Sequence, residues 1–308
     1  MEAYILKHKD FRTRLLSRSG GFFTAISDYV LEHNGVIYGA VQDGDFIVRH
    51  KRADSICVRD LMRGVKYTQS QMGECFSSAK QDLDRGISVL FTGTPCQIDG
   101  LLNFLGKNYE HLITVDNICH GVVSPDVWQE YVKNFEARKK VSEAVFRNKY
   151  KFGWKDHHET IIYTDGTSCD STNFADLYNS GIAYRACCYS CRYNSLDRLA
   201  DFTVGDAWGI DQYFPEFNDD NGVSLLLSMT PKADRLLKII RSNFDICKID
   251  INDFESKILE APSINKHDRD RFWNDKAKMG IWNAMQKAKV KLERKRFVSR
   301  LKRKLHLK

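Results

Sequence analysis

Residues 87–97 read ISVLFTGTPCQ, and this stretch determines the fold that we expect. Its first half is a continuous apolar run between Gly86 and Gly93, a pattern typical of a strand that is buried on both faces. Residues 112–118 form a second apolar run, and apolar residues with helical spacing lie between the two runs, at Ile98, Leu101, Leu102 and Leu105. Strand, helix and strand in this order predict a βαβ unit whose two strands are parallel.

The flanking sequence continues the alternation of strands and helices. After a short polar opening, we expect helices at 22–34, 74–84, 125–137 and 233–242, and strands at 36–41, 46–48, 201–205 and 223–229. The cysteine-rich stretch at 185–191 shows no regular pattern. The sequence therefore predicts an α/β fold: a mixed, partly parallel sheet with flanking helices and a cysteine-bearing irregular segment.

Composition and charge divide the chain into a body and a tail. Of the 308 residues, 43% are hydrophobic, which suffices for a large core. The net charge of +7 is uneven, because residues 285–308 carry +10 and the rest of the chain −3. We expect one domain over residues 1–284 and a basic amphipathic tail over 285–308. The tail predicts contact with anionic lipid, with a solvated helix as the alternative, and no nucleic-acid partner is expected because no recognition motif accompanies it.

The sequence also predicts a compartment. It contains no run of about eighteen apolar residues, and residues 1–8 lack the features of a secretory signal. We therefore expect a cytoplasmic protein, peripheral at the inner face of the membrane if the tail binds lipid. In that reducing compartment the nine cysteines favour metal binding or catalysis over disulfides.

Cysteines stand at three places that suit metal chemistry. Cys188 and Cys191 form a Cys-x-x-Cys pair, whose spacing suits a metal, a cluster, a zinc knuckle, a redox dithiol or two inert thiols. Cys96 stands at the expected start of a helix, where the helix dipole favours a thiolate. Cys119 follows the next strand. We expect Cys96 and Cys119 to meet at one rim of the sheet, since these strands are neighbours; otherwise each is a buried cysteine that only packs.

Several motifs occur together in one order along the chain. They are Ser19-Gly20-Gly21, the loop 64–70, Gly93-Thr94-Pro95-Cys96-Gln97, Cys119-His120-Gly121-Val122, the pair Cys188 and Cys191, and Gly205-Asp206-Ala207-Trp208-Gly209. In this order and spacing the chain resembles the coenzyme F420 hydrogenase/dehydrogenase beta-subunit family from about residue 4 to residue 240. The ferredoxin-like N-terminal domain of many relatives has no counterpart in this sequence.

The resemblance implies two cofactors and the residues that hold them. It implies a [4Fe-4S] cluster on Cys96, Cys119, Cys188 and Cys191, with FAD beside it. It also implies that the flavin pocket is shaped by Ser19, Gly20, Gly21, Lys66, Tyr67, Thr92, Gly93 and Thr94. We add His120 and Asp206 as candidate cofactor-binding residues. The residues alone also permit a plain helix cap at Ser19, a surface lysine at Lys66, a packing role for Tyr67 and a local hydrogen bond at His120.

The activity implied by the resemblance is that of an iron-sulfur flavoprotein oxidoreductase acting on a small molecule. The implied partner is a separate ferredoxin-like protein that exchanges electrons with it. Many bacterial relatives look like accessory proteins of surface-polysaccharide gene clusters, in organisms not expected to use coenzyme F420, so use of that coenzyme stays open. The alternative is a non-catalytic, zinc-binding accessory protein of a polysaccharide assembly system.

Overall fold

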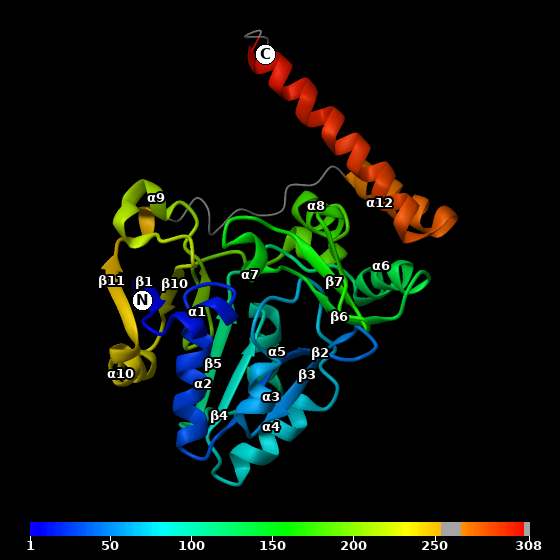
Figure 1. Ribbon diagram of the computed structural model, residues 1–308. Coiled ribbons are helices and arrows are strands. Elements are labelled where there is room, and N and C mark those ends of the chain that lie inside the picture. The colour runs from blue at the N-terminus through cyan, green and yellow to red at the C-terminus, as the bar shows by residue number, and fades with distance from the viewer. Residues whose placement is uncertain (254–265, 305–308) are drawn as a thin grey trace.

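The computed structural model describes residues 1–253 and 266–304, without the side chains of 253, 266, 267 and 290–304. An eight-stranded sheet forms the centre, in the order β11-β1-β10-β9-β5-β4-β2-β3 (Figure 1). Its strands are β1 (Glu2–His8), β2 (Val36–Gln42), β3 (Val48–Ala53), β4 (Val89–Gly93), β5 (Leu112–Asn117), β9 (Phe202–Asp206), β10 (Ser224–Ser228) and β11 (Phe244–Ile249).

Four neighbouring strands make the parallel part of this sheet. Strands β2, β4, β5 and β9 run parallel, with Leu90 opposite Ile113 and Val115 opposite Phe202. The remaining strands pair antiparallel. The predicted βαβ unit is confirmed as β4, α5 (Pro95–Leu105) and β5. The sheet is therefore mixed and partly parallel, as expected.

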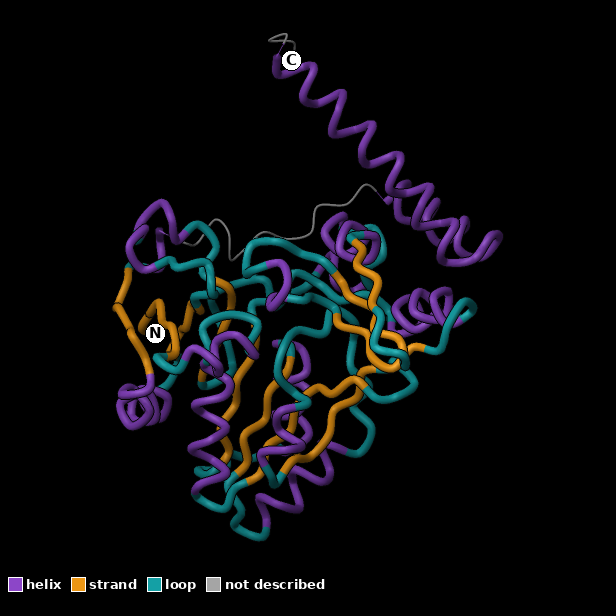
Figure 2. Tube along the Cα trace, viewed as in Figure 1, coloured by secondary structure: helices purple, strands orange, loops and turns teal. Residues whose placement is uncertain are grey.

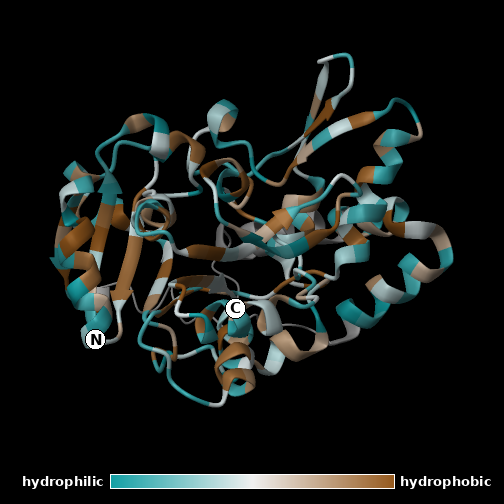
Figure 3. Cartoon of the chain, turned by 90° about the horizontal axis from the view of Figure 1, so that it is seen from below, coloured by the Kyte–Doolittle hydropathy of each residue, from teal (hydrophilic) through white to brown (hydrophobic). Residues whose placement is uncertain are grey.

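Helices cover both faces of the sheet, because each presents one apolar stripe to it. On one face, α2 (Phe22–Glu32) and α10 (Pro231–Ile240) pack over the strands. On the other face lie α4 (Cys75–Asp84) and α5. Figure 2 shows these layers, and Figure 3 shows hydrophobic residues concentrated on the strands. Short helices connect them: α1 (Phe11–Leu16), α3 (Ile56–Asp60) and α9 (Ile210–Tyr213).

A second, three-stranded antiparallel sheet lies beside the first. It consists of β6 (Val141–Val145), β7 (Glu159–Tyr163) and β8 (Ser168–Ser171). An aromatic core joins it to its helices, with Trp128 stacked on Phe146 at 3.9 Å and edge-on to Phe174. The helices of this part are α6 (Pro125–Glu136), α7 (Lys149–Phe152), α8 (Asn173–Ser180) and the start of α12 (Lys266–Lys304).

The expected irregular segment is confirmed between α8 and β9. It contains a single 3-10 turn, η1 (Ala186–Ser190), which carries Cys187 and Cys188 and is followed by Cys191. Within the described residues, no helix is both long enough and apolar enough to cross a lipid bilayer.

Two sequence expectations differ from the structure. Residues 2–8 are strand β1, between β10 and β11, and not a polar opening. Ile5 and Leu6 are fully buried, but only pairing with strands more than 200 residues away makes this short segment part of the core. The expected strand at 46–48 begins instead at Val48 and runs to Ala53, because Phe46 adopts a positive φ of 63° in the preceding turn.

Helix α12 carries the start of the basic tail. It bends at Gly280, whose φ of 78° is not helical, and Ala284 and Met285 are buried against the body. The basic residues from 290 onward, together with Phe297, Leu301 and Leu305, lie outside the described side chains.

Truncating β1 inside the core tests its place in the sheet. We expect Ile5→Ala to lower the free energy of unfolding by about 2–5 kcal/mol, because a fully buried side chain leaves a cavity. The matched control is Ile239→Ala, 56% exposed, with an expected change of about 0.5 kcal/mol or less. Urea unfolding measures both variants, and equal effects would contradict the central position of β1.

Candidate functional site

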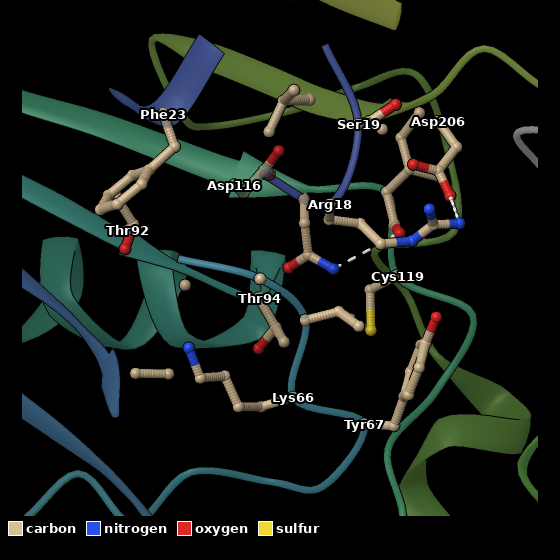
Figure 4. Close-up of a pocket in the computed structure, with 18 of the residues that line it drawn as sticks. Arg18, Ser19, Phe23, Lys66, Tyr67, Thr92, Thr94, Asp116, Cys119 and Asp206 are labelled. Carbon is tan, nitrogen blue, oxygen red and sulfur yellow. Dashed lines mark hydrogen bonds and ion pairs between the residues drawn. The ribbon is translucent and has the colours of Figure 1, made fainter. Parts of the chain in front are cut away.

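A cavity of about 650 Å³ lies at the carboxyl ends of the parallel strands. Strand ends β4, β5 and β9 form its floor, and the loops at 17–23 and 62–70 form its sides. Arg147, His157 and Tyr178 reach it from the second-sheet region. Figure 4 shows Thr92, Thr94 and Lys66 on one side of the cavity and Tyr67, Cys119 and Asp206 on the other. Ligands of parallel α/β sheets bind at this end because the strands leave a crevice there.

Nine of the ten residues predicted to bind a cofactor line this one cavity. They are Ser19, Gly21, Lys66, Tyr67, Thr92, Gly93, Thr94, His120 and Asp206. Gly20 is the exception, because it is enclosed between β1 and β10. Its backbone N–H donates to Ser224 Oγ at 2.9 Å, and a Cβ atom there would lie 2.2 Å from the carbonyl oxygen of Leu6. The structure thus gives Gly20 a packing role that allows the neighbouring residues to reach the cavity.

A buried lysine that the sequence analysis missed organises the loop before α2. The Nζ atom of Lys149 donates to the carbonyl oxygens of Arg14, Ser17 and Ser19, at 2.5, 3.0 and 3.3 Å. Burial, then the charges of Arg18 and Arg14, lower the pKa of Lys149 to about 7. Lys149 therefore fixes the loop by hydrogen bonds to its backbone and not by an ion pair.

Positive charge gathers at the end of the cavity beside Trp208. Arg18 forms an ion pair with Asp206 at 2.5 Å and lies over the Trp208 ring, 5.5 Å from its centroid. Arg147 lies 5.6 Å from the same ring. Burial lowers the pKa of Arg147, and the charge of Arg18 lowers it further. Asp206 pairs with Arg18, which leaves net positive charge on the two guanidinium groups, so this end of the cavity is suited to an anionic group.

His157 also faces this end of the cavity. Burial, followed by the nearby charges of Arg147 and Arg18, lowers the pKa of His157 to about 3. Its ring is therefore neutral at physiological pH and stands 4.7 Å from that of Tyr67. No sequence pattern singles out Arg18, Arg147 or His157, because they come from separate segments.

Lys66 and Tyr67 come from the loop at 62–70, which forms one side of the cavity. Lys66 Nζ donates to the carbonyl oxygens of Leu61 and Arg63 at 3.0 and 2.7 Å, and burial lowers its pKa to about 7. The Tyr67 ring packs against that of Tyr178 at 4.2 Å. The loop thus presents an amine and an aromatic face to the cavity.

The four predicted cluster cysteines converge beside the cavity. The thiol of Cys119 interacts electrostatically with those of Cys188, Cys96 and Cys191. Burial first, and then these three neighbours, raise the pKa of Cys119 to about 12. Burial likewise raises the pKa of Cys188 to about 11, with Cys187 as a close neighbour. Cys96 and Cys191 are exposed, so the group lies at the surface.

Two sets of contacts bring these cysteines together from distant segments. The loop of Cys119 is joined to the segment before Cys188, since the Arg185 N–H donates to the carbonyl oxygen of Val122 at 3.0 Å. Helix α5, which carries Cys96, is joined to the segment after Cys191, since Arg192 donates to Asp99 of this helix at 2.6 Å. Tyr193 donates to the same carboxylate.

Gly121 is required for the first of these contacts. Its φ is +123°, which disfavours any side chain, and a Cβ atom there would lie 2.4 Å from the Tyr184 ring. This close approach lets the loop of Cys119 lie against Tyr184 and so against the segment of Cys188.

Among the described residues, no group of three or more Cys, His, Asp or Glu side chains is close enough to hold a single metal ion. A four-iron core is wider than one ion, so its ligand sulfurs stand farther apart. Four thiols are the donor set that such a core takes, and Cys119 has the other three as electrostatic neighbours.

Asp116 is a further cavity residue that the sequence analysis missed. It is 1% exposed at the end of β5, and its Oδ1 atom has no hydrogen-bond partner. Arg198 lies 3.8 Å from its other oxygen. Burial raises the pKa of Asp116 to about 6, although Thr203 and Arg198 lower it in part. A single carboxylate near the end of an apolar strand gave no signal in the sequence.

Together, the fold and site define an α/β protein with a large ligand cavity at the strand ends and four converging cysteines beside it. The model of one protein family, described as the C-terminal region of the coenzyme F420 hydrogenase/dehydrogenase beta chain, matches residues 87–253. This match covers more than half of the chain and includes all four cysteines. The chain therefore belongs to the coenzyme F420 hydrogenase/dehydrogenase beta-subunit family, a family of oxidoreductase subunits.

A solved structure shares this fold. It is a chain of the F420-reducing [NiFe] hydrogenase complex from Methanosarcina barkeri, studied in a xenon-derivatised form. The TM-score is 0.58 at 16% sequence identity, over 88% of this chain and 92% of that chain. No curated protein matches the sequence.

The buried carboxyl group of Asp116 predicts a pH dependence of stability. Because its folded-state pKa is raised, proton uptake stabilises the folded protein fully below the usual pKa of a carboxyl group, and this contribution is lost as the pH rises through about 6. Asparagine cannot ionise, so it does not lose this contribution. The free energy of unfolding of Asp116→Asn, relative to that of wild type, should therefore rise by about 1 kcal/mol from about pH 5 to about pH 7.5. Thermal unfolding at both pH values measures this gain.

The control is the exposed Asp245→Asn, which we expect to follow the wild type at both pH values. If the stabilities of Asp116→Asn and wild type differ by the same amount at both pH values, Asp116 does not titrate in this range.

Proposed function

We propose that the protein is an iron-sulfur flavoprotein oxidoreductase, in which electrons pass between a [4Fe-4S] cluster and FAD. Cys96, Cys119, Cys188 and Cys191 would hold the cluster, and the cavity would hold the flavin. One observation carries the proposal: Cys119 belongs both to the converging thiols and to the wall of the cavity. The two groups would therefore be adjacent, as direct electron transfer requires.

The chemistry of the thiols supports a cluster. Burial and mutual repulsion disfavour the thiolate form of Cys119 and Cys188. A positively charged iron core reverses this preference, since metal binding displaces the thiol protons. Cys96 is the second residue of α5, after Pro95, where the helix dipole stabilises negative charge on sulfur.

The cavity has the size and chemistry that a flavin needs. Its volume of about 650 Å³ lies within the range of about 300–1,000 Å³ found for small-molecule sites. Gly21 and Gly93 let the backbone approach a ligand closely, and Lys66 and Arg18 are cationic side chains of the lining that would attract phosphate groups. Tyr67 and Phe23 add aromatic surface for a flat ring.

When bound, the flavin would supply both one-electron and hydride chemistry. The chain's own residues would bind and orient it: the loop held by Lys149 forms one side, and the loop of Lys66 and Tyr67 forms another. Asp116 offers the unpartnered Oδ1 atom as a hydrogen-bond acceptor at the floor. The substrate is a small molecule that reaches the same cavity.

We extend the proposal to the electron-transfer partner of the protein, its compartment and its biological role. A ferredoxin-like protein would exchange electrons with the exposed cluster end, where Cys96 and Cys191 lie at the surface. We place the protein in the cytoplasm, with the flavin and cluster domain in residues 1–284 and a lipid-contacting tail in residues 285–308. We also place the protein in surface-polysaccharide biosynthesis, as the resemblance to bacterial accessory proteins implies; the use of coenzyme F420 stays open.

Cofactor analysis tests the cluster directly. We expect brown protein after anaerobic purification, with about four iron and four sulfide per chain. Cys191→Ser should lose most of this iron, and its exposure makes a folding defect a poor explanation for the loss. The matched control, Cys57→Ser, removes another exposed thiol outside the group and should keep the iron.

Near-zero iron after reconstitution would overturn the proposal. Stoichiometric zinc without flavin would instead favour the alternative of a zinc-binding accessory protein, because four thiolates also form a structural zinc site. Inductively coupled plasma analysis of the same samples distinguishes the two metals.

Binding of FAD tests the cavity. Lys66→Met keeps the length of the side chain but removes its amine, so we expect the dissociation constant of FAD to rise about tenfold, the loss of roughly one ionic hydrogen bond. Fluorescence titration of the apoprotein measures the constant. Lys51→Met, an exposed lysine of β3 paired with Asp43, should leave it unchanged; equal affinities of Lys66→Met and wild type would place the flavin elsewhere.

A further inference from the structure

A chain of hydrogen bonds runs along the cavity wall and ends at one of the cluster cysteines. It begins at His50 of β3, which is 6% exposed. His50 Nε2 lies 2.8 Å from the carbonyl oxygen of Thr92, which can only accept, so Nε2 carries the proton. Burial lowers the pKa of His50, so the ring is neutral and Nδ1 is an acceptor. Ser70 Oγ, 2.7 Å away, therefore donates to Nδ1.

This fixed histidine determines the orientation of Gln97. Since the Ser70 hydroxyl proton is used by His50, its oxygen accepts from Gln97 Nε2 at 2.9 Å. The amide oxygen of Gln97 consequently faces the other way, where it accepts from the Thr94 backbone N–H at 2.9 Å. Thr94 and Gln97 thus form the capping box at the start of α5.

The hydroxyl group of Thr94 then has two acceptors within reach. Its Oγ1 atom lies 3.1 Å from Gln97 Oε1 and 3.1 Å from Cys96 Sγ. Gln97 Oε1 already accepts the Thr94 N–H, whereas a thiolate is a charged acceptor and forms the stronger bond. With Cys96 ionised as a ligand, the hydroxyl proton points to the sulfur.

We propose that the chain His50–Ser70–Gln97 holds Thr94 as a hydrogen-bond donor to the sulfur of Cys96, and so raises the reduction potential of the cluster. This inference rests on the proposed function. A donor to a ligand sulfur stabilises the reduced cluster, which carries one more negative charge, and hydrogen bonds to sulfur are among the factors that set such potentials. Thr94 is accordingly a positioning residue that couples the cavity wall to the cluster.

The test compares cluster potentials in the anaerobically purified full chain. Thr94→Val keeps the side-chain shape but removes the donor, so we expect a midpoint potential more negative than that of wild type, at equal iron content. Thr94→Ser should return the potential toward wild type. Ser70→Ala breaks the chain away from the cysteine and should produce a smaller shift in the same direction. Potentiometric titration followed by electron paramagnetic resonance measures each value.

Thr167→Val is the matched control, because Thr167 is not part of the cavity lining and its hydroxyl donates to Asp165 and not to a cysteine. Its cluster potential should equal that of wild type. A Thr94→Val protein with full iron and the wild-type potential would overturn the inference.

Circular dichroism shows whether Thr94→Val is folded. If it is folded but has lost iron, iron content is compared with that of Thr94→Ser: retention of iron by Thr94→Ser supports the role of the hydroxyl group, and loss of iron from both variants overturns it. A wild-type protein without iron would refute the proposed function itself, a result distinct from either of these.

Discussion

The parallel pairing of β4 with β5 and β9 is the constraint on which the site depends. Parallel strands end at the same edge of a sheet, so the turn after β4, the loop after β5 and the turn after β9 meet there. The turn after β4 delivers Thr94 and Cys96, and the loop after β5 delivers Cys119 and His120. A single register of hydrogen bonds thereby places the cavity floor and two of the four thiols.

The second sheet and its helices supply the part of the cavity wall that the strand ends do not form. Arg147, His157 and Tyr178 reach the cavity from this region, and Lys149 binds the backbone of the loop that precedes α2. The irregular segment then returns the chain to the strand ends, where contacts with the Cys119 loop and with α5 hold it. The site therefore lies between two structural layers, and a ligand there would contact both.

Burial of charge gives this site its electrostatic character. Burial lowers the pKa values of Lys66 and Lys149 to about 7 and raises the pKa of Asp116 to about 6. Such groups change protonation near neutral pH, and an anionic ligand would favour the charged lysines. Membership of a family of oxidoreductase subunits agrees with a pocket of this kind.

The sequence by itself determined the parallel βαβ unit, because this unit lies in one continuous run whose spacing reflects local structure. The four cysteines and nine residues of the cavity wall were expected from motifs that resemble a known family, and not from local spacing. The sequence did not determine that residues 2–8 form a central strand, since that strand is buried only by partners at 224–228 and 244–249. Nor did it reveal Arg18, Arg147, Lys149 or Asp116, which are brought together from separate segments. Their roles follow from long-range packing, because burial and proximity, which shift a pKa or orient a donor, exist only after the distant strands have paired.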